Sequence, residues 1–303
     1  MGTDTKDKKI LVLGANGFVG QNLIESLSES SCYELVTPTS RDLNALDESQ
    51  VNKELSSCRY DVVLNCLDRS GVADASYAEQ RLRMYHNLAS RSNLYGKMIY
   101  FGTGAEYGRQ LPLSKVTEDD YGRCIPLDSY GFAMYQMADH ALRSDNIFNL
   151  RLFGIFGPGE DWKQRFISNA IVKALLELPI TIRQDRIMDY LDVADLATPV
   201  MWAIDNDPAH HAYNATSGIS YHLSELAESV LMQTGSRSKI IICNEGLAQN
   251  EYTSSNERLR SECPQFAVRA MADSIDALVL YYDKMLRALS KEEIGAIKEA
   301  LLY

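Results

Sequence analysis

Short apolar segments alternate with longer stretches in which apolar residues recur every three or four positions, from residue 8 to about residue 157. This alternation is typical of βαβ units, in which a helix connects two parallel strands of the same sheet. Strands are predicted at residues 10–13, 33–37, 62–66, 97–102 and 148–153. The pattern therefore predicts an α/β fold with a Rossmann-type, doubly wound parallel sheet, formed by a first domain over residues 1–157.

Beyond residue 157 the pattern changes. It predicts a helix at residues 166–178, a strand at residues 180–183 and a helix at residues 223–233. Ser290 and Glu293 form a capping-box pattern that opens a last amphipathic helix. We expect a smaller C-terminal α/β lobe over residues 158–303, lying against the carboxyl edge of the sheet, and we leave open whether the chain crosses between the two domains.

Composition and charge restrict the class of protein. With 303 residues, 46% of them hydrophobic and 23% charged, the chain can form a main domain and a smaller lobe. A net charge of −11 argues against a nucleic acid or an anionic membrane as main partner, but is compatible with a local basic pocket for a small anion. The polar first nine residues, and the lack of any apolar run of about 18 residues, predict a cytoplasmic protein without a membrane span. The six cysteines form no Cys-x-x-Cys pair, so no metal site is predicted.

A glycine-rich turn follows the first predicted strand and precedes a helix with Leu23, Ile24 and Leu27 on one face. Glycines at this spacing permit a tight turn and let the backbone approach a pyrophosphate, while the helix N-terminus donates N–H groups to the phosphates. The sequence therefore predicts a dinucleotide-binding site in the first domain. Its residues are Gly14, Asn16, Gly17, Phe18, Val19 and Gly20 in the turn, with Cys66 and Leu67 after the third strand.

The end of the second predicted strand indicates which dinucleotide binds. An NAD site has an acidic residue there for the ribose 2′-hydroxyl, but residues 37–41 read Thr-Pro-Thr-Ser-Arg. Ser40 and Arg41 suit the 2′-phosphate of NADP instead, because a guanidinium offers a fixed fork of donors. We expect NADP, as NADPH, with NAD the less favoured cofactor. The competing interpretation is that Arg41 pairs with Asp42 or Asp47.

Four further segments carry a family resemblance. Residues 101–108 read Phe-Gly-Thr-Gly-Ala-Glu-Tyr-Gly, residues 129–134 Ser-Tyr-Gly-Phe-Ala-Met, residues 151–159 Arg-Leu-Phe-Gly-Ile-Phe-Gly-Pro-Gly, and residues 189–196 Asp-Tyr-Leu-Asp-Val-Ala-Asp-Leu. With the glycine turn, they resemble the extended short-chain dehydrogenase/reductase family of nucleotide-sugar epimerases, dehydratases and 4-ketoreductases, over most of the chain. The resemblance implies a nucleotide-sugar substrate, Tyr130 as catalytic tyrosine and cofactor contact, and Thr103 as catalytic hydroxyl.

Departures from the family pattern restrict the reaction. The family motif is Tyr-x-x-x-Lys, and Met134 takes the place of the lysine that lowers the tyrosine pKa and holds the nicotinamide ribose. Gly154 stands where an asparagine usually faces the substrate. The 4,6-dehydratases have Thr-Asp-Glu where this chain has Thr103, Gly104 and Ala105, so dehydration is disfavoured. Ala105 also replaces the cysteine with which enzymes similar to GDP-fucose synthase epimerise their substrate.

Loss of the lysine penalises reduction less than oxidation. To oxidise a sugar hydroxyl, Tyr130 must act as a base, yet only about one part in a thousand of a phenol with a pKa of about 10 is ionised at pH 7. To reduce a 4-keto sugar, it must donate a proton, and that phenol is fully protonated. We therefore expect an NADPH-dependent reductase of a 4-keto-6-deoxy nucleotide sugar, with hydride transfer to C4, proton donation by Tyr130 and a hydrogen bond from Thr103. The alternatives are a nucleotide-sugar 4-epimerase with bound NAD, and a catalytically impaired protein that binds NADP or a nucleotide sugar.

Position in the family pattern also suggests contacts to the substrate and between subunits. The expected substrate-binding residues are Thr103, Gly104, Ala105, Glu106, Gly154, Arg165, Asn169, Arg183, Arg186 and Arg258, with the arginines facing the diphosphate. The family often forms homodimers through a four-helix bundle with two helices from each subunit, here residues 78–92 and 130–143. The apolar residues expected there are Leu82, Tyr85, Phe132, Tyr135 and Met137.

Overall fold

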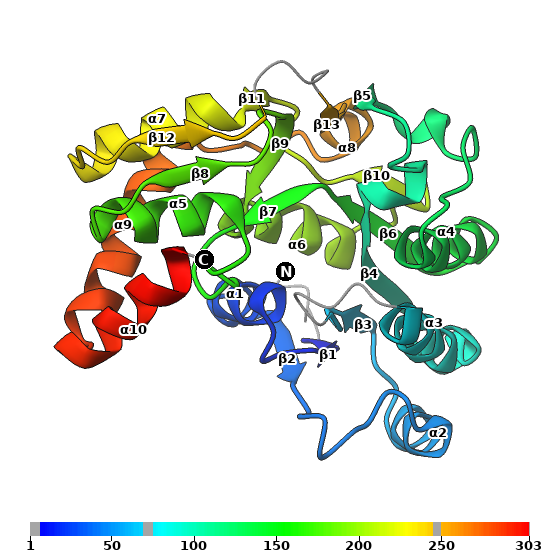
Figure 1. Ribbon diagram of the computed structural model, residues 1–303. Helices are drawn as coiled ribbons and strands as arrows, with labels where there is room; N and C mark the ends of the chain where they lie inside the picture. Colours follow the sequence, from blue (N-terminus) through cyan, green and yellow to red (C-terminus); the bar gives the residue numbers. More distant parts are fainter. Residues whose placement is uncertain (1–6, 69–74, 245–249, 303) are drawn as a thin grey trace.

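A six-stranded parallel sheet forms the centre of the molecule (Figure 1). The computed structural model describes residues 7–68, 75–244 and 250–302, and all elements below lie in these stretches. The strands run in the order β10-β6-β4-β3-β1-β2, and each neighbouring pair is parallel. They are β1 (Lys8–Leu13), β2 (Tyr33–Val36), β3 (Val62–Asn65), β4 (Lys97–Thr103), β6 (Ile147–Leu152) and β10 (Ala212–Asn214). The five strands predicted for the first domain and the Rossmann-type fold are confirmed.

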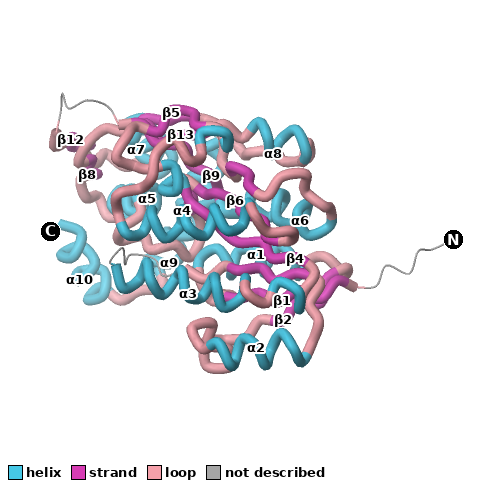
Figure 2. The backbone as a smooth tube through the Cα atoms, turned by 90° about the vertical axis from the view of Figure 1, so that its right-hand side faces the viewer, coloured by secondary structure: helices cyan, strands magenta, loops and turns pink. Residues whose placement is uncertain are grey.

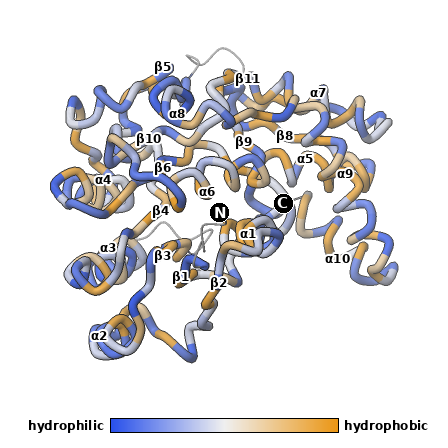
Figure 3. Tube along the Cα trace, turned by 180° about the vertical axis from the view of Figure 1, so that it is seen from behind, coloured by the Kyte–Doolittle hydropathy of each residue, from blue (hydrophilic) through white to orange (hydrophobic). Residues whose placement is uncertain are grey.

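Helices cover both faces of this sheet, because successive side chains of a strand point to opposite sides. The helices are α1 (Phe18–Ser28), α2 (Glu48–Ser57), α3 (Ala75–Ala89), α4 (Ser129–Leu142) and α6 (Ala197–Asp205). Ile10 and Val12 of β1 belong to the core under α1 and α6, whereas Leu11 and Leu13 belong to the core under α2, α3 and α4. On this second face α3 and α4 lie side by side (Figures 1 and 2). Accordingly, β1, β3 and β4 carry hydrophobic residues along most of their length (Figure 3).

The rest of the chain forms two smaller sheets and a helical layer with a core of its own. One sheet has the order β11-β9-β13-β5, with β7 paired to β9, and the other pairs β12 with β8. The strands are β5 (Leu113–Val116), β7 (Gly154–Phe156), β8 (Ile180–Ile182), β9 (Ile187–Asp192), β11 (Ser220–His222), β12 (Ile240–Ile242) and β13 (Glu251–Ser254). The α-helices are α5 (Phe166–Leu175), α7 (Leu223–Thr234), α8 (Glu257–Glu262), α9 (Met271–Arg287) and α10 (Lys291–Leu302). Short 3₁₀ helices are η1 (Ser92–Leu94), η2 (Gly104–Tyr107), η3 (Glu118–Asp120) and η4 (Val193–Leu196).

The elements predicted after residue 157 are present, with one difference in length. The helix expected to reach residue 178 ends at Leu175, and Glu177 adopts a left-handed backbone with φ of 56° that a helix cannot continue through. The capping box of α10 is confirmed. The Ser290 N–H donates to the Glu293 carboxylate at 2.8 Å, and the Glu293 N–H donates to the Ser290 hydroxyl at 3.2 Å. Within the described stretches no helix combines the length and the apolar character needed to span a membrane.

Each of the two larger sheets contains one strand from the other part of the sequence. β10, from beyond residue 157, pairs with β6 at one edge of the six-stranded sheet. β5, from before residue 157, pairs with β13 in the five-stranded sheet. The chain therefore crosses between the two parts, and a division into domains at residue 157 remains a prediction.

Candidate active site

The glycine turn packs closely against the end of β3. Gly14 has φ of 79°, and a Cβ placed on it would lie 2.6 Å from the Cys66 carbonyl oxygen. A Cβ on Gly20 would lie 2.2 Å from the Gly14 carbonyl oxygen, so only glycine lets α1 pack this closely on the turn. These close contacts explain why Gly14 and Gly20 are glycines, and they place the turn tightly against the carboxyl edge of β1 and β3.

The N-terminus of α1 fits a diphosphate. Its N-cap is Gly17, and among the described residues no side chain caps it, and the first turn has no acidic residue. The N–H groups of the first turn are therefore available to an anion, and the helix dipole favours a negative charge there. Asn16 is exposed, while Phe18 and Val19 are half-buried. The predicted cofactor residues of the turn thus lie where a pyrophosphate can approach backbone donors.

Arg41 is exposed, and the two carboxylates that could compete for it bond to other groups. Asp42 accepts hydrogen bonds from the Thr39 N–H at 3.0 Å and from its hydroxyl at 2.7 Å. Asp47 caps α2 by accepting from the N–H groups of residues 49 and 50. In the part of the chain that the structure describes, Arg41 forms no ion pair. Its guanidinium is compatible with the predicted 2′-phosphate contact.

Tyr130 is brought to the end of β4 by a close contact between α4 and η2. Asp128 caps α4 by accepting a hydrogen bond from the Gly131 N–H at 2.8 Å. A Cβ on Gly131 would lie 3.1 Å from the Ala105 carbonyl oxygen, so the glycine beside Tyr130 allows the helix to approach η2. Because Thr103 is the last residue of β4 and the N-cap of η2, Tyr130 and Thr103 occupy the same edge of the sheet.

Tyr252 is a site residue that the sequence did not reveal. Its hydroxyl lies 3.4 Å from the Thr103 Oγ1, and its ring packs 4.7 Å, centroid to centroid, from Phe153. A Cβ on Gly104 would lie 2.6 Å from this hydroxyl, which explains the glycine. Burial raises the pKa of Tyr252 to about 12, and the hydrogen bond with Thr103 partly offsets that effect. Tyr252 comes from β13, about 150 positions further along the chain, and no local motif marks it.

The phenol of Tyr130 lies among one aromatic ring and two arginines. Its ring stacks on Tyr77 of α3 with a centroid distance of 6.4 Å, and the Cζ atom of Arg109 lies 5.9 Å from its centroid. Burial raises the pKa of Tyr130 above its usual value, while the charges of Arg81 and Arg109 act in the opposite direction. The phenol is therefore protonated at neutral pH. Tyr77, Arg81 and Arg109 were not predicted from the sequence.

Met134 is fully buried one helical turn after Tyr130. Its Sδ atom accepts a hydrogen bond from the Nε of Arg81, at 3.1 Å. The position that the family resemblance assigns to a lysine is therefore part of the core between α3 and α4 and is apolar. The cation in contact with residue 134 is Arg81, which belongs to α3.

Glu106, one of the predicted substrate contacts, is directed into the interior of the protein. Its side chain is fully buried, and its carboxylate forms an ion pair with the Nε of Arg151 at 2.6 Å. It also accepts from the Asn149 amide and from the Thr103 N–H, the latter at 3.0 Å. Glu106 thus closes the capping box of η2 and faces the interior. The Thr-x-x-Glu spacing was a signal for this role that sequence reasoning overlooked.

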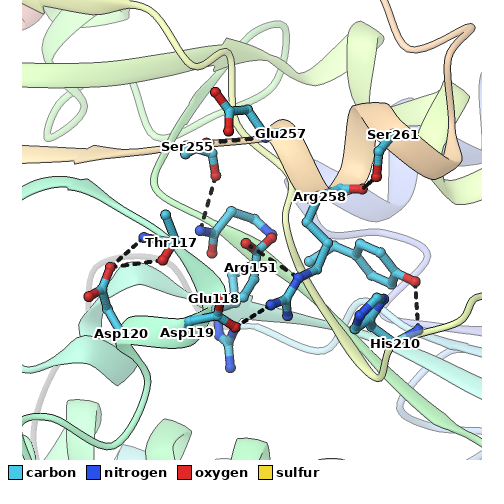
Figure 4. A network of polar contacts seen from close by, with 12 residues as sticks. Thr117, Glu118, Asp119, Asp120, Arg151, His210, Ser255, Glu257, Arg258 and Ser261 are labelled. Carbon is cyan, nitrogen blue, oxygen red and sulfur yellow. Dashed lines mark hydrogen bonds and ion pairs between the residues drawn. The ribbon is translucent and has the colours of Figure 1, made fainter.

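Arg258, another predicted substrate contact, lies in a group of charged residues. Its guanidinium bonds to Asp119 at 2.5 Å and lies 3.8 Å from the Glu118 carboxylate (Figure 4). These two contacts join α8 to η3, and a contact of Arg258 with a diphosphate remains a prediction. Glu118 also accepts a hydrogen bond from the Asn214 N–H at 2.7 Å, which ties this group to β10.

The remaining predicted substrate residues lie around β7, α5 and β9. A Cβ on Gly154 would lie 2.5 Å from the Asp189 carbonyl oxygen, so the pairing of β7 with β9 requires glycine there. Arg165, Arg183 and Arg186 are exposed, and none of the three is in an ion pair within the described residues. Asn169 is half-buried and donates to the Lys163 carbonyl at 3.2 Å. Their contact with a substrate remains a prediction.

Comparison with known proteins agrees with the Rossmann-type sheet and gives the family. The model described as "NAD dependent epimerase/dehydratase family" matches residues 10–216. The chain belongs to this family. GDP-L-colitose synthase of Yersinia pseudotuberculosis is 27% identical over 119 residues, which is 37% of this chain and 38% of that enzyme.

Two solved structures share the fold along nearly the whole chain. A GDP-6-OMe-4-keto-L-xylo-heptose reductase from C. jejuni has a TM-score of 0.81 at 17% identity, covering 94% of this chain and 100% of that one. A GDP-mannoheptose C4 reductase from Campylobacter jejuni, with NADP bound, has a TM-score of 0.80 at 18% identity, covering 93% and 100%. At these identities the likeness concerns the fold.

Proposed function

We propose that this protein is an NADPH-dependent reductase of a 4-keto nucleotide sugar. The observation that carries the proposal is the placement of Tyr130 beside the end of β4, where Thr103 and Tyr252 present their hydroxyls. A proton donor next to hydroxyl groups at the carboxyl edge of a Rossmann-type sheet suits reduction of a carbonyl. The two fold neighbours described above, both reductases of GDP-linked sugars, support the same choice.

The protonated state of Tyr130 favours reduction over oxidation. Bound NADPH would supply a hydride to the C4 carbonyl carbon. Tyr130 donates its phenolic proton to the oxygen of that carbonyl, and Thr103 donates a hydrogen bond to the same atom. Because burial raises the pKa of Tyr130, its proton is present at neutral pH and the tyrosine is a poor base. A 4-epimerase, which has to oxidise its substrate first, is therefore the less supported reading.

NADPH is the proposed cofactor, and the 6-deoxy form of the sugar is the proposed substrate class. Arg41 offers an exposed guanidinium with no ion pair in the described stretches, and Ser40 lies beside it. The N–H groups at the start of α1 would hold the pyrophosphate. Arg165, Arg183 and Arg186, with Asn169, would face the diphosphate of the sugar nucleotide.

The test is single-turnover oxidation of NADPH, followed at the nicotinamide absorbance, with a panel of GDP-, CDP-, UDP- and dTDP-linked 4-keto-6-deoxy sugars. One of the panel should cause decay, which identifies the nucleotide. Tyr130→Phe should reduce the rate by about 10² to 10⁴ and leave the Kd for NADPH unchanged. No decay with any sugar, despite tight NADPH binding, would contradict the proposal. NAD that co-purifies, with interconversion of sugars and no net loss of NADPH, would indicate the epimerase.

The cofactor choice has its own test. Arg41→Ala should raise the Kd for NADPH at least tenfold and leave the Kd for NADH nearly unchanged, because only NADPH carries the 2′-phosphate. Equal losses for both cofactors would mean that Arg41 supports the fold of the turn instead. Arg59→Ala, a change at an exposed arginine before β3, is the control.

A further inference from the structure

Two residues of α3 face two residues of α4, each pair one helical turn apart. Tyr77 stacks on Tyr130, and the Nε of Arg81 donates to the Sδ of Met134 at 3.1 Å. Since positions i and i+4 lie on one side of a helix, Arg81 and Tyr130 belong to the same contact surface between α3 and α4. A cation from α3 therefore lies beside the helical turn that carries the proposed proton donor.

Arg81 is held rigidly in this position. Only 6% of its surface is exposed, and its Nη2 donates to the Phe101 carbonyl at 2.9 Å. Its Nη1 donates to the Leu67 carbonyl. Phe101 lies near the end of β4 and Leu67 follows β3, so the guanidinium lies at the carboxyl edge of the sheet, next to the glycine turn. A charge fixed in this way acts on its neighbours without reorganising.

The carboxylate of Asp68 partly offsets the effect of Arg81 on the pKa of Tyr130. Asp68 lies 3.1 Å from the Nη1 of Arg81 and accepts a hydrogen bond from the Tyr77 hydroxyl. The side chain of Asp68 is 49% exposed, so water screens its charge more than it screens the buried guanidinium. Arg81 lowers the pKa of Tyr130 by more than Asp68 raises it. Glu106 also raises the pKa of Tyr130 and Arg109 also lowers it, both by smaller amounts.

We propose that Arg81 is the positioning residue of the reaction: from α3 it supplies the fixed positive charge beside Tyr130 that residue 134 of α4 does not carry. The inference rests on the proposed role of Tyr130 as proton donor. Met134 fits this arrangement because a thioether can lie against the guanidinium, whereas a second cation at residue 134 would repel it. Arg81 touches neither the proposed substrate nor the reacting atoms, and acts through Tyr130.

The charge can be tested without any substrate. A fluorinated tyrosine placed at position 130 makes the phenol more acidic, and its ¹⁹F shift follows the titration of this ring alone. Arg81→Met should raise the pKa of that phenol by about 1 or more, since an opposite charge at close range has been removed. The double change Arg81→Met with Met134→Lys returns a cation from α4 and should restore most of the original value. A merely structural role of Arg81 predicts no such rescue.

Two further outcomes keep the proposal open to refutation. Arg81→Gln, which keeps a side-chain N–H donor but carries no charge, should also raise the pKa of the phenol, and it keeps the test possible if Arg81→Met fails to fold. An unchanged pKa in either folded variant would overturn the proposal. Since the titration uses no sugar, it stays informative if the panel of substrates shows no turnover. Conversely, turnover with an unchanged titration refutes the role of Arg81 alone.

Discussion

At the scale of single residues, the structure shows how buried charges are balanced. Arg151 is wholly buried and pairs with Glu106, and its Cζ atom lies 5.1 Å from the ring centroids of both Tyr107 and Tyr121. This pair joins β6 to η2, directly behind Thr103. A charge left alone in this environment has no water to replace its partner.

Removing one member of that pair should therefore weaken the whole protein. Arg151→Met is expected to lower the free energy of unfolding by about 3 to 5 kcal/mol, because Glu106 is left as an uncompensated buried carboxylate. Urea denaturation measures the change. Arg143→Met removes an exposed i,i+4 pair with Asp139 and should alter stability by no more than about 0.5 kcal/mol. A loss for Arg151→Met as small as that of the control would refute the prediction.

Glu160 gives the stability a dependence on pH. Burial raises the pKa of its carboxyl from 4.5 to about 7, although a hydrogen bond from the Ser168 hydroxyl partly opposes this. Between these values the folded state keeps a proton that the unfolded state has released. The contribution of Glu160 to the free energy of unfolding therefore falls as the pH rises through this range, by about 3 kcal/mol in all.

Glu160→Gln should remove this dependence. The gain in free energy of unfolding of this variant over the native chain should be larger at pH 8 than at pH 5. At pH 5 both side chains are neutral, whereas at pH 8 only the glutamate is charged. Urea denaturation at the two pH values checks this. Glu292→Gln, at an exposed position of α10, should show no comparable difference. A pH dependence that survives in Glu160→Gln would mean that other groups cause it.

The candidate site could be predicted from the sequence only where short motifs define it. Thr103 and Tyr130 were recognised from segments of a few residues, and the structure brings both to one edge of the sheet. Tyr252 reaches Thr103 across 149 positions and Arg81 reaches Met134 across 53. Such contacts depend on the packing of β13 and α3, and no local pattern encodes them. The catalytic roles of Thr103 and Tyr130 remain predictions.

At the scale of elements, the glycine turn shows how packing, more than local preference, decides where a residue is tolerated. Both Gly20 and Gly295 lie in helices, where glycine is usually unfavourable relative to alanine. A Cβ on Gly20 would lie 2.2 Å from a backbone oxygen, whereas none of the described atoms lies within 4 Å of one on Gly295. The same substitution should therefore have opposite effects at the two positions.

Gly20→Ala is expected to lower the free energy of unfolding by about 1 to 3 kcal/mol and to weaken NADPH binding, because α1 must move away from the turn. Gly295→Ala should raise stability by about 0.5 to 1 kcal/mol, since it reduces the freedom of the unfolded chain. Thermal unfolding and fluorescence titration with NADPH measure the two effects. A gain in stability for Gly20→Ala as well would show that the contact with Gly14 relaxes easily.

Five of the six strands of the central sheet were predicted, because their apolar runs are bounded by turns and most of them are buried on both faces. The end of α5 was not, because the left-handed residue Glu177 carries no sequence signal such as glycine. The pairings of β5 with β13 and of β10 with β6 could not be predicted either, because they join short strands that are distant in the sequence.

At the scale of the whole molecule, the expected dimer surface needs revision. Tyr85 and Met137, two of the residues assigned to it, are fully buried in the core of their own subunit. Tyr135 stacks on Tyr121 with a centroid distance of 4.8 Å, and Leu82 is partly buried against the same core. Phe132 is the member of the predicted set that is exposed, at 47%. If α3 and α4 form a four-helix bundle with a second copy, Phe132 should lie in its interface.

Phe132→Glu should then convert a dimer into monomers, because it places a charge in an apolar contact. Light scattering after size-exclusion chromatography gives the mass of the particle. Met232→Glu, on α7 and 72% exposed, is the matched control and should leave the mass unchanged. A native chain that is monomeric at micromolar concentration, or a dimer that persists in Phe132→Glu, would exclude this interface.

The crossing of β10 into the first sheet also determines when this protein can fold during its synthesis. β6 ends at Leu152 and its partner begins at Ala212, so the edge of β6 stays unpaired while roughly 60 residues are added. At about 5 to 20 residues per second this takes roughly 3 to 12 s. An open strand edge of that duration invites pairing with other nascent chains. The yield of soluble protein should therefore respond to translation speed and chaperone supply more than to the stability of the finished fold.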